Sequence, residues 1–410
     1  MRSYFTRARL LAGVLLLAFL AQAAWLVYRE VGSGEVPDSA EATRIGEGWK
    51  QWHGRGMAGA PFGDFASSAA ADLVGTHPWG DESGFDSEHS PFLYLVSAAP
   101  LLAWPKDFDR ESAVYWRWLA RLPFLACGVF LGASLWYVAR RLCGTTGGFI
   151  ALTFYSFSPS LIQTGAAWHV EPQIFAAWGA FGAVFTAIAV AHTLYAPREV
   201  VLWNWRRIVL LGIALAIAVA SQFSMIVLVP IALGFLLYVA PVRRGAGTVI
   251  WIAACVVGLV LLFAVYFFHP HAFARAMQHA VFWGATGRGF GVFGVYKQVA
   301  VQIGRACPAL ALALPFTIVT YAVWPRTRYF GNTAPLLVAV IFILLGMAHT
   351  DRGGAGFLIA SAPFLFLFVA GVLADLMETR YRAVVSAGVV GLLLAYVAWS
   401  IGSLSAVPAG

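Results

Sequence analysis

Residues 207–240 read RIVLLGIALAIAVASQFSMIVLVPIALGFLLYVA, a run of 34 residues with no charge after Arg207. A transmembrane helix needs about 20 apolar residues to cross the hydrocarbon core of a bilayer, so this run is too long for one span. Ser221 and Gln222 lie near its middle and offer a polar turn. The run therefore predicts two short transmembrane helices, 207–221 and 223–240, and the rest of the chain is interpreted from them.

The composition places most of the chain in a membrane. The 410 residues are 60% hydrophobic and 11% charged, with a mean hydropathy of +0.76, whereas soluble domains are about 45–50% apolar and about 25% charged. The first apolar run, of about 18 residues, exceeds the 7–15 of a signal peptide core, so an uncleaved helix is predicted there. Counting this first run, nine spans besides the two in 207–240 are predicted, at 10–28, 119–139, 147–164, 173–193, 248–268, 308–324, 333–348, 354–374 and 384–402. The sequence thus predicts an all-α polytopic protein with about eleven spans, in a single transmembrane domain over 1–402 followed by a short tail, 403–410.

Basic residues in the short turns set the predicted orientation. Fourteen of the 27 Lys and Arg fall on one side of the predicted bundle: Arg2, Arg7, Arg9, Arg140, Arg141, Arg198, Arg206, Arg207, Arg243, Arg244, Arg326, Arg328, Arg380 and Arg382. The positive-inside rule assigns this side, with the N-terminus, to the cytoplasm. The assignment requires that residues 91–104, only 14 residues interrupted by Pro100, do not cross, so they are predicted as an interfacial or re-entrant helix. No basic helix with interleaved aromatic residues accompanies the net charge of +8, which argues against nucleic acid as a partner.

Two long loops are predicted on the outer side. The first, 29–118, holds fourteen of the nineteen acidic residues and is too long to be a simple connection. It is expected to fold onto the membrane surface and to carry interfacial helices. The second, 269–306, is basic, and its glycines at 284–294 predict a flexible middle.

Two acidic residues are the main catalytic candidates. Asp38 precedes a predicted helix over 39–50, where it is suited to be the N-cap with Glu41 as its capping-box partner. That structural role is compatible with catalysis, because a cap also fixes the position of a carboxylate. Glu171 lies directly before Pro172, which suits the first position of the next span. An ionisable residue at a membrane boundary is a functional candidate, although a solvated turn is the alternative.

Cationic residues in the outer loops are candidates for holding a phosphate. Arg352, together with Lys297 or Arg288, can bind phosphate oxygens, since a guanidinium matches them in pairs. The alternative for Asp351 and Arg352 is a solvated ion pair. His89 opens the 91–104 helix and is either a phosphate contact or an ordinary neighbour of the cap. His169 and His349 are possible supporting residues. No HExxH pattern is present, so the sequence leaves metal dependence open, including use of a divalent cation.

The order of these features resembles the GT-C superfamily of polyprenyl-phosphate-sugar-dependent glycosyltransferases. The most similar members are bacterial proteins related to protein O-mannosyltransferases, lipid A aminoarabinose transferase and the rhizobial lipopolysaccharide-core transferases. The resemblance covers roughly 10–240 and extends loosely to 375. It rests on Asp38, His89-Ser90-Pro91-Phe92-Leu93-Tyr94, Arg121-Leu122-Pro123, Ala139-Arg140-Arg141-Leu142, Ser158-Pro159 and Glu171-Pro172 in this order.

The resemblance implies an inverting transfer of a sugar from a polyprenyl phosphate to a glycan, lipid or protein acceptor at the periplasmic face of a bacterial inner membrane. It implies that Asp38 is the general base and that Glu171 orients the acceptor or a metal. His89, Arg352 and Lys297 would hold the donor phosphate. The chain departs from the family pattern at Ser39, Gln222 and Gly353, where a second acid, a lysine and an Arg-Tyr-x-x-Pro segment are usual.

Two other classes of function stay open. One is a membrane transporter or flippase, against which we note that no acid or base is predicted deep within a helix, where transport sites usually lie. The other is a non-catalytic partner in the synthesis of envelope polysaccharide. The sequence does not select the sugar or the acceptor.

Overall fold

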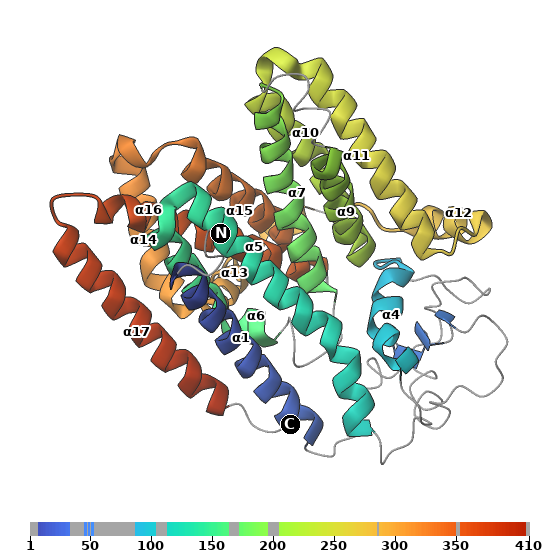
Figure 1. Cartoon of the computed structure of the whole chain (residues 1–410), viewed down its shortest axis with the longest axis horizontal. Coiled ribbons are helices and arrows are strands. Elements are labelled where there is room, and N and C mark those ends of the chain that lie inside the picture. The colour runs from blue at the N-terminus through green and yellow to red at the C-terminus, as the bar shows by residue number, and fades with distance from the viewer. Residues whose placement is uncertain are drawn as a thin grey trace, which may run out of the picture. The chain divides into compact units, whose positions relative to one another are not determined.

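The computed structural model describes residues 7–32, 45–46, 48–49, 51–52, 87–103, 113–163, 172–195, 205–284, 287–349 and 353–406. All regular secondary structure in these ranges is helical (Figure 1). The chain divides into two compact units. The first unit is made of residues 1–33, 124–168 and 285–410, and the second of residues 34–123 and 169–284.

Helices from three parts of the chain form the first unit. They are α1 (Arg7–Gly32), most of α5 (Ala113–Ser156), α6 (Pro159–Ile162), η5 (Arg288–Gly291), α13 (Phe293–Ala306), α14 (Pro308–Val323), η6 (Pro325–Thr327), α15 (Phe330–Ala348), α16 (Gly353–Met377) and α17 (Arg382–Ala406). Helix α16 is central, because every side chain from Phe364 to Ala370 is at most 3% exposed. A helix that is apolar and buried all round is the core of a bundle.

Polar side chains of other helices donate hydrogen bonds to the end of helix α5 in the first unit. Pro159 has no N–H to donate, so the last carbonyl groups before it lack their helical partners. Three side chains from distant helices donate to them instead: Gln22 to Ser156 at 3.0 Å, Tyr396 to Phe154 at 3.0 Å and Ser400 to Phe157 at 2.6 Å. In an apolar environment these bonds are required, because no water is present to replace them.

The second unit is built from shorter elements. They are α4 (Pro91–Ala98), η1 (Ala99–Ala103), the start of α5, α7 (Gln173–Thr193), α9 (Trp205–Ser221), η3 (Phe223–Val227), α10 (Leu228–Val239), η4 (Pro241–Arg243), α11 (Arg244–Val265) and α12 (Pro270–His279). Small residues allow close helix packing: a Cβ on Gly179 of α7 would lie 2.6 Å from the backbone nitrogen of Ala218 of α9. Such small contacts are the usual way in which helices associate within a bilayer.

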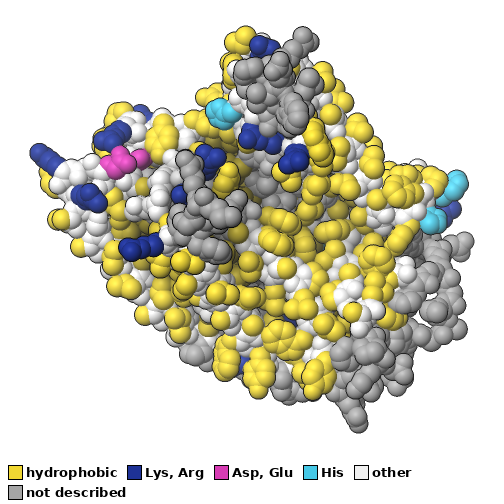
Figure 2. All heavy atoms as spheres, in the orientation of Figure 1, with side chains coloured by type: hydrophobic (Ala, Val, Ile, Leu, Met, Phe, Trp, Pro, Cys, Tyr) yellow, Lys and Arg dark blue, Asp and Glu magenta, His cyan; other side chains and the backbone are white. Residues whose placement is uncertain are grey.

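The fold confirms a multi-pass membrane protein. Seven helices of the described chain are long and apolar enough to cross, or eight if the bent pair α13 and α14 is counted as one span. Hydrophobic side chains cover most of the surface in Figure 2, as expected for contact with lipid. The predicted number of eleven is not reached by this measure. One reason is that α5 joins two predicted spans across Gly144, whose φ of 72° interrupts the helix.

The predicted break in the longest apolar run is confirmed. Helix α9 ends at Ser221 and η3 begins at Phe223, and Gln222 between them has an extended backbone. Its side chain donates to the hydroxyl of Ser224 at 2.8 Å. The two segments, 205–221 and 223–239, have 17 residues each, which makes them shorter than a full span.

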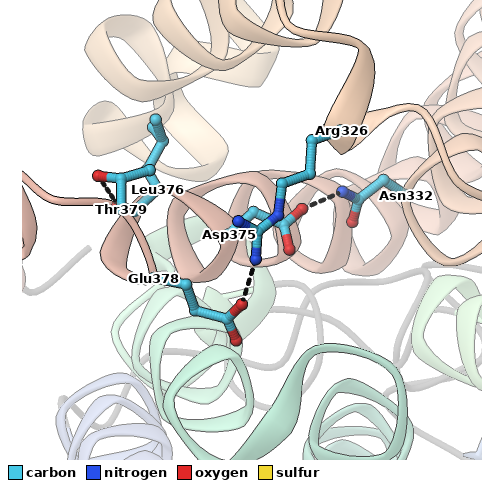
Figure 3. A network of polar contacts seen from close by, with 6 residues as sticks. All are labelled: Arg326, Asn332, Asp375, Leu376, Glu378 and Thr379. Carbon is cyan, nitrogen blue, oxygen red and sulfur yellow. Dashed lines mark hydrogen bonds and ion pairs between the residues drawn. The ribbon is translucent and has the colours of Figure 1, made fainter.

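Contacts within each unit bring basic turns together at one end. In the first unit, Arg326 forms an ion pair with Glu378 at 2.8 Å, so the turn after α14 lies beside the turn after α16 (Figure 3). In the second unit, Arg207 donates to Ala189 at 3.2 Å and Tyr195 donates to Val239 at 3.3 Å. These contacts agree with the grouping that the charge pattern predicts. The assignment of that side to the cytoplasm stays a prediction.

Two predicted boundaries were wrong. Helix α5 begins at Ala113 rather than at 119, and its second half ends at Ser156 rather than at 164 because Pro159 follows. The second outer loop is largely helical, since α12, η5 and α13 lie within 269–306. The glycines of this segment suggested a loop, but Val295, Val299 and Ile303 recur at helical spacing and face inward in α13.

Candidate functional site

The segment Ser87–Pro91 is fixed by backbone bonds to two other parts of the second unit. The N–H of Phe223 donates to Glu88 at 2.9 Å, and the N–H of Val281 donates to Ser87 at 2.8 Å. Ser90 is fully buried, and its hydroxyl donates to the carbonyl of Ala220 at 2.7 Å. The same hydroxyl caps helix α4 by accepting from the N–H of Phe92 at 3.2 Å, and Pro91 occupies the first turn. The backbone that carries His89 is therefore held rigidly.

Two further segments that the sequence analysis linked to catalysis contact helix α4. Phe92 packs edge-on against Phe175 near the start of α7, with ring centres 5.5 Å apart. Residues 45–52, where described, are helical and lie on α4: Trp52 donates from its indole nitrogen to Leu95 at 2.9 Å. Gly48 has no room for a Cβ, because the carbonyl of Tyr94 occupies that place. The helix predicted over 39–50 therefore meets α4 through its second half.

An apolar cluster supports α4. Phe92 packs on a cluster formed by Val219, Ala220, Phe223 and Leu262, and Phe273 and Phe282 pack on the same cluster. The ring of Phe223 lies 5.5 Å from that of Phe282. The cluster fixes α4 to the ends of α9 and α11. The Ser87–Pro91 segment therefore precedes a helix that is packed against an apolar cluster, which limits the movement of its polar groups.

Sequence reasoning missed two buried cations. Because α5 begins at Ala113, Arg117 and Arg121 lie inside the helix, one turn apart, and are only 4% and 1% exposed. Arg121 donates to the carbonyl of Arg117 at 3.2 Å. A buried charge is stable only beside an opposite charge and hydrogen-bond partners. The described part of this unit holds one acidic side chain, Glu88. An arginine inside an apolar run was the signal for this site.

Two other predicted residues lie in the first unit. His349 is buried at the end of α15; its Nδ1 lies 2.8 Å from the carbonyl of Leu345, and its ring lies 5.1 Å from that of Phe357. Lys297 is exposed on α13. His349 is thus packed into the bundle rather than solvated, and it can support the turn between α15 and α16.

Six predicted site residues lie outside the described residues: Asp38, Glu41, His169, Glu171, Asp351 and Arg352. Their roles stay predictions. In the ranges that the structure describes, no group of three or more His, Cys, Asp or Glu could hold a metal ion. The question of a divalent cation remains as the sequence left it.

Comparisons with known proteins agree with this fold. Residues 115–268 match the family model for dolichyl-phosphate-mannose-protein mannosyltransferases. The structure resembles the Archaeoglobus fulgidus oligosaccharyltransferase AglB solved with an inhibitory peptide and a dolichol-phosphate, with a TM-score of 0.61, 12% identity, and coverage of 98% of this chain and 56% of that one. It also resembles that organism's oligosaccharyltransferase tethered to an acceptor peptide with an NVT sequon, with a TM-score of 0.57, 12% identity, and coverage of 100% and 54%.

A third solved structure, the apo form of the Archaeoglobus fulgidus oligosaccharyltransferase, matches with a TM-score of 0.54, 13% identity, and coverage of 100% of this chain and 55% of that one. The chain thus spans about half the length of the solved structures that it matches. No curated protein sequence matches it. The chain shares the fold of these oligosaccharyltransferases, and the family match over residues 115–268 agrees with the resemblance to the GT-C superfamily that its motifs suggested.

Proposed function

We propose that this protein is a membrane glycosyltransferase that moves a sugar from a polyprenyl-phosphate donor to an acceptor at the outer, periplasmic face. The observation that carries the proposal is the set of contacts on α4. His89 directly precedes this helix, the second half of the helix predicted to begin at Asp38 lies on it, and the start of α7, just after Glu171, packs against it. The described sequence neighbours of three candidates therefore contact one element, which supports a common site for them.

The chemistry follows from the residue types. The oxygen or nitrogen of the acceptor attacks the anomeric carbon from the side opposite the phosphate, and its proton passes to the carboxylate of Asp38. The bond between the anomeric carbon and the phosphate oxygen breaks, and the phosphate leaves with the electron pair. The configuration of the sugar inverts. A phosphate needs cationic stabilisation more than protonation, and His89, Arg352 and Lys297 supply it.

The remaining candidates have supporting roles in this proposal. Glu171 orients the acceptor or a metal, and Glu41 holds the helix that Asp38 begins. The stretch that matches the family model, residues 115–268, runs from the start of α5 past the end of α11, and one solved structure of this fold holds a dolichol-phosphate.

Transfer from a radiolabelled polyprenyl-phosphate sugar by the purified protein tests the proposal. Replacing the base, Asp38→Asn, is expected to lower the rate by about 10²–10⁴-fold, the usual contribution of a general base, while the folded state is retained. The matched control is Asp64→Asn, an acid of the same loop outside the motifs, and its rate is expected to be unchanged. Full activity in Asp38→Asn would remove Asp38 as the base.

A transporter or flippase is the second candidate, because Arg117 and Arg121 supply the buried charges inside a helix that the sequence analysis had not found. The two functions are separated by reconstituting the protein in vesicles with a labelled polyprenyl-phosphate sugar. A flippase moves the labelled lipid between leaflets without an acceptor. A glycosyltransferase yields free polyprenyl phosphate only when an acceptor is present.

A further inference from the structure

Helix α13 meets α14 at a sharp angle. The two helices are bent by 110° at Cys307, which has an extended backbone, and Pro308 opens α14. Helix α14 exposes a long apolar face, with Leu312 72% and Val319 61% exposed, as a helix in contact with lipid does. If α14 crosses the bilayer, a bend of this size leaves α13 close to the plane of the membrane.

Helix α13 has three distinct sides. Successive residues turn by about 100° around a helix, so each side is defined by spacing. Val295, Val299 and Ile303 face inward, and α13 packs on α6, α14, α15 and α16 of the first unit. The hydroxyl of Ser158 anchors its end by donating to the carbonyl of Ala306 at 2.5 Å. One side of the helix is therefore fixed to protein, and two sides remain exposed.

The two exposed sides differ in chemistry. The aromatic edge consists of Phe293, Tyr296 and Ala300, and Phe293 is 84% exposed. The polar edge lies on the other side of the inward face and consists of Lys297, Gln298, Val301, Gln302 and Arg305, all exposed. No acidic residue occurs in the helix. An aromatic edge beside a cationic edge is the pattern of a helix that lies in a membrane interface.

We propose that α13 is an interfacial helix whose polar edge binds the phosphates of anionic phospholipids of the bilayer while its aromatic edge enters the acyl chains. Lys297 and Arg305 are eight residues apart, which is roughly 12 Å along a helix, so each engages a separate headgroup. A phenylalanine as exposed as Phe293 is unfavourable in water and favourable among acyl chains. This inference goes beyond sugar transfer, because its ligand is the surrounding bilayer; it assigns Lys297 to the phospholipids and leaves the donor phosphate to His89 and Arg352.

Lipid retention in nanodiscs tests the polar edge. Protein is reconstituted in equal parts of phosphatidylglycerol and phosphatidylcholine, without any polyprenyl lipid, and the lipids that stay bound on extraction are counted by mass spectrometry. In wild type, phosphatidylglycerol is expected to be enriched over phosphatidylcholine among the bound lipids. In the double variant Lys297→Gln/Arg305→Gln this enrichment is expected to fall about three- to tenfold, given the usual contribution of a cation near an anionic surface. The control Gln298→Ala/Gln302→Ala, on the same edge, is expected to retain it.

The results of this experiment decide the proposal without any sugar-transfer assay, so its failure is separate from failure of the proposed function. Equal retention in wild type and Lys297→Gln/Arg305→Gln would overturn it, as would an equal loss in the control. A second measurement places the edges. Spin labels are attached to Ala300→Cys or Gln298→Cys in a chain without its four native cysteines. The label at 300, on the aromatic edge, is expected to be accessible to oxygen. The label at 298, on the polar edge, is expected to be accessible to a water-soluble nickel complex. The same accessibility at both positions would exclude the in-plane orientation.

Discussion

The hydroxyl of Ser90 lies 2.7 Å from the carbonyl oxygen of Ala220, and the backbone N–H of Ser90 donates to the same oxygen at 3.2 Å. One serine thus caps α4 and closes the end of α9, 130 residues away in sequence. The residue belongs to the His89-Ser90-Pro91 motif that first indicated a GT-C resemblance. Its role here is to hold the backbone on which His89 stands.

Replacing this hydroxyl is expected to destabilise the second unit. Ser90→Ala leaves a buried carbonyl and the N–H of Phe92 with weaker partners, which costs about 1–3 kcal/mol. Ser97→Ala is the matched control, because Ser97 is equally buried on the same segment but bonds only locally, to Tyr94 at 2.9 Å. Thermal unfolding in detergent is expected to show the larger loss for Ser90→Ala. Equal losses would mean that the long-range bond to Ala220 adds nothing.

The close approach of α7 and α9 gives a second prediction. Gly179→Ala places a Cβ 2.6 Å from a backbone nitrogen of α9, so the helices must separate, at a cost of about 1–3 kcal/mol. Gly234→Ala in α10 introduces the same group where no atom lies within 4 Å, and it is expected to be within about 0.5 kcal/mol of wild type. Unfolding midpoints of the two variants check this. A neutral Gly179→Ala would show that the helices are not packed this closely.

The polar network at the end of α16 predicts unequal effects of two small changes (Figure 3). Asn332 is fully buried and donates to Thr327 at 3.0 Å and to Asp375 at 2.9 Å. Asn332→Ala removes both bonds and is expected to cost about 1–3 kcal/mol. Glu378→Gln breaks only an ion pair whose side chains are 55% and 67% exposed, which is worth at most about 1 kcal/mol. A larger loss of thermal stability for Glu378→Gln would contradict this ranking.

Arg352 is expected to act on the donor and not on the fold. Arg352→Ala removes a cation proposed to hold the phosphate, so the KM for the polyprenyl-phosphate sugar is expected to rise by about tenfold or more. The control is Arg382→Ala, which is expected to leave KM unchanged. Arg382 follows the far end of α16, so the predicted topology puts it on the other side of the membrane from Arg352. An unaltered KM in Arg352→Ala would exclude this role.

The predicted orientation is open to labelling in intact cells. A cysteine at Ala60→Cys, in the acidic loop, is expected to react with a membrane-impermeant maleimide added outside, because the positive-inside rule places this loop there. A cysteine at Gly245→Cys, next to Arg243 and Arg244, is expected to react only after lysis. Both are made in a chain without native cysteines. The reverse result would invert the topology.

Composition and periodicity predicted most of the bundle. The break at Ser221-Gln222 was predictable because a 34-residue apolar run exceeds the thickness of a bilayer. The helices within 269–306 were not, because glycines at 284–294 obscure the inward spacing of Val295, Val299 and Ile303. The start of α5 was misplaced because Arg117 interrupts the apolar run, and hydropathy treats a buried arginine as an end.

The candidate site was predicted only in part, for a physical reason. His89 was selected from a motif, and its rigid placement depends on bonds from Phe223 and Val281, which lie more than 100 residues away. Sequence spacing carries no information on such long-range pairing. For the same reason the packing of Trp52 on α4 could not be anticipated.

The two helices that follow one another at Gln222 have a consequence for the surrounding lipid. Each segment of 17 residues is roughly 25 Å long, about one turn less than the hydrocarbon layer of about 30 Å. A bilayer adapts to such a mismatch by becoming thinner beside the protein, at a modest energy per ångström. Where both segments cross the membrane, such thinning would bring the phosphate groups of the bilayer closer to Ser90, which bonds to the end of α9. An amphiphile that must present its headgroup there would then travel a shorter distance out of the bilayer than beside a full-length helix.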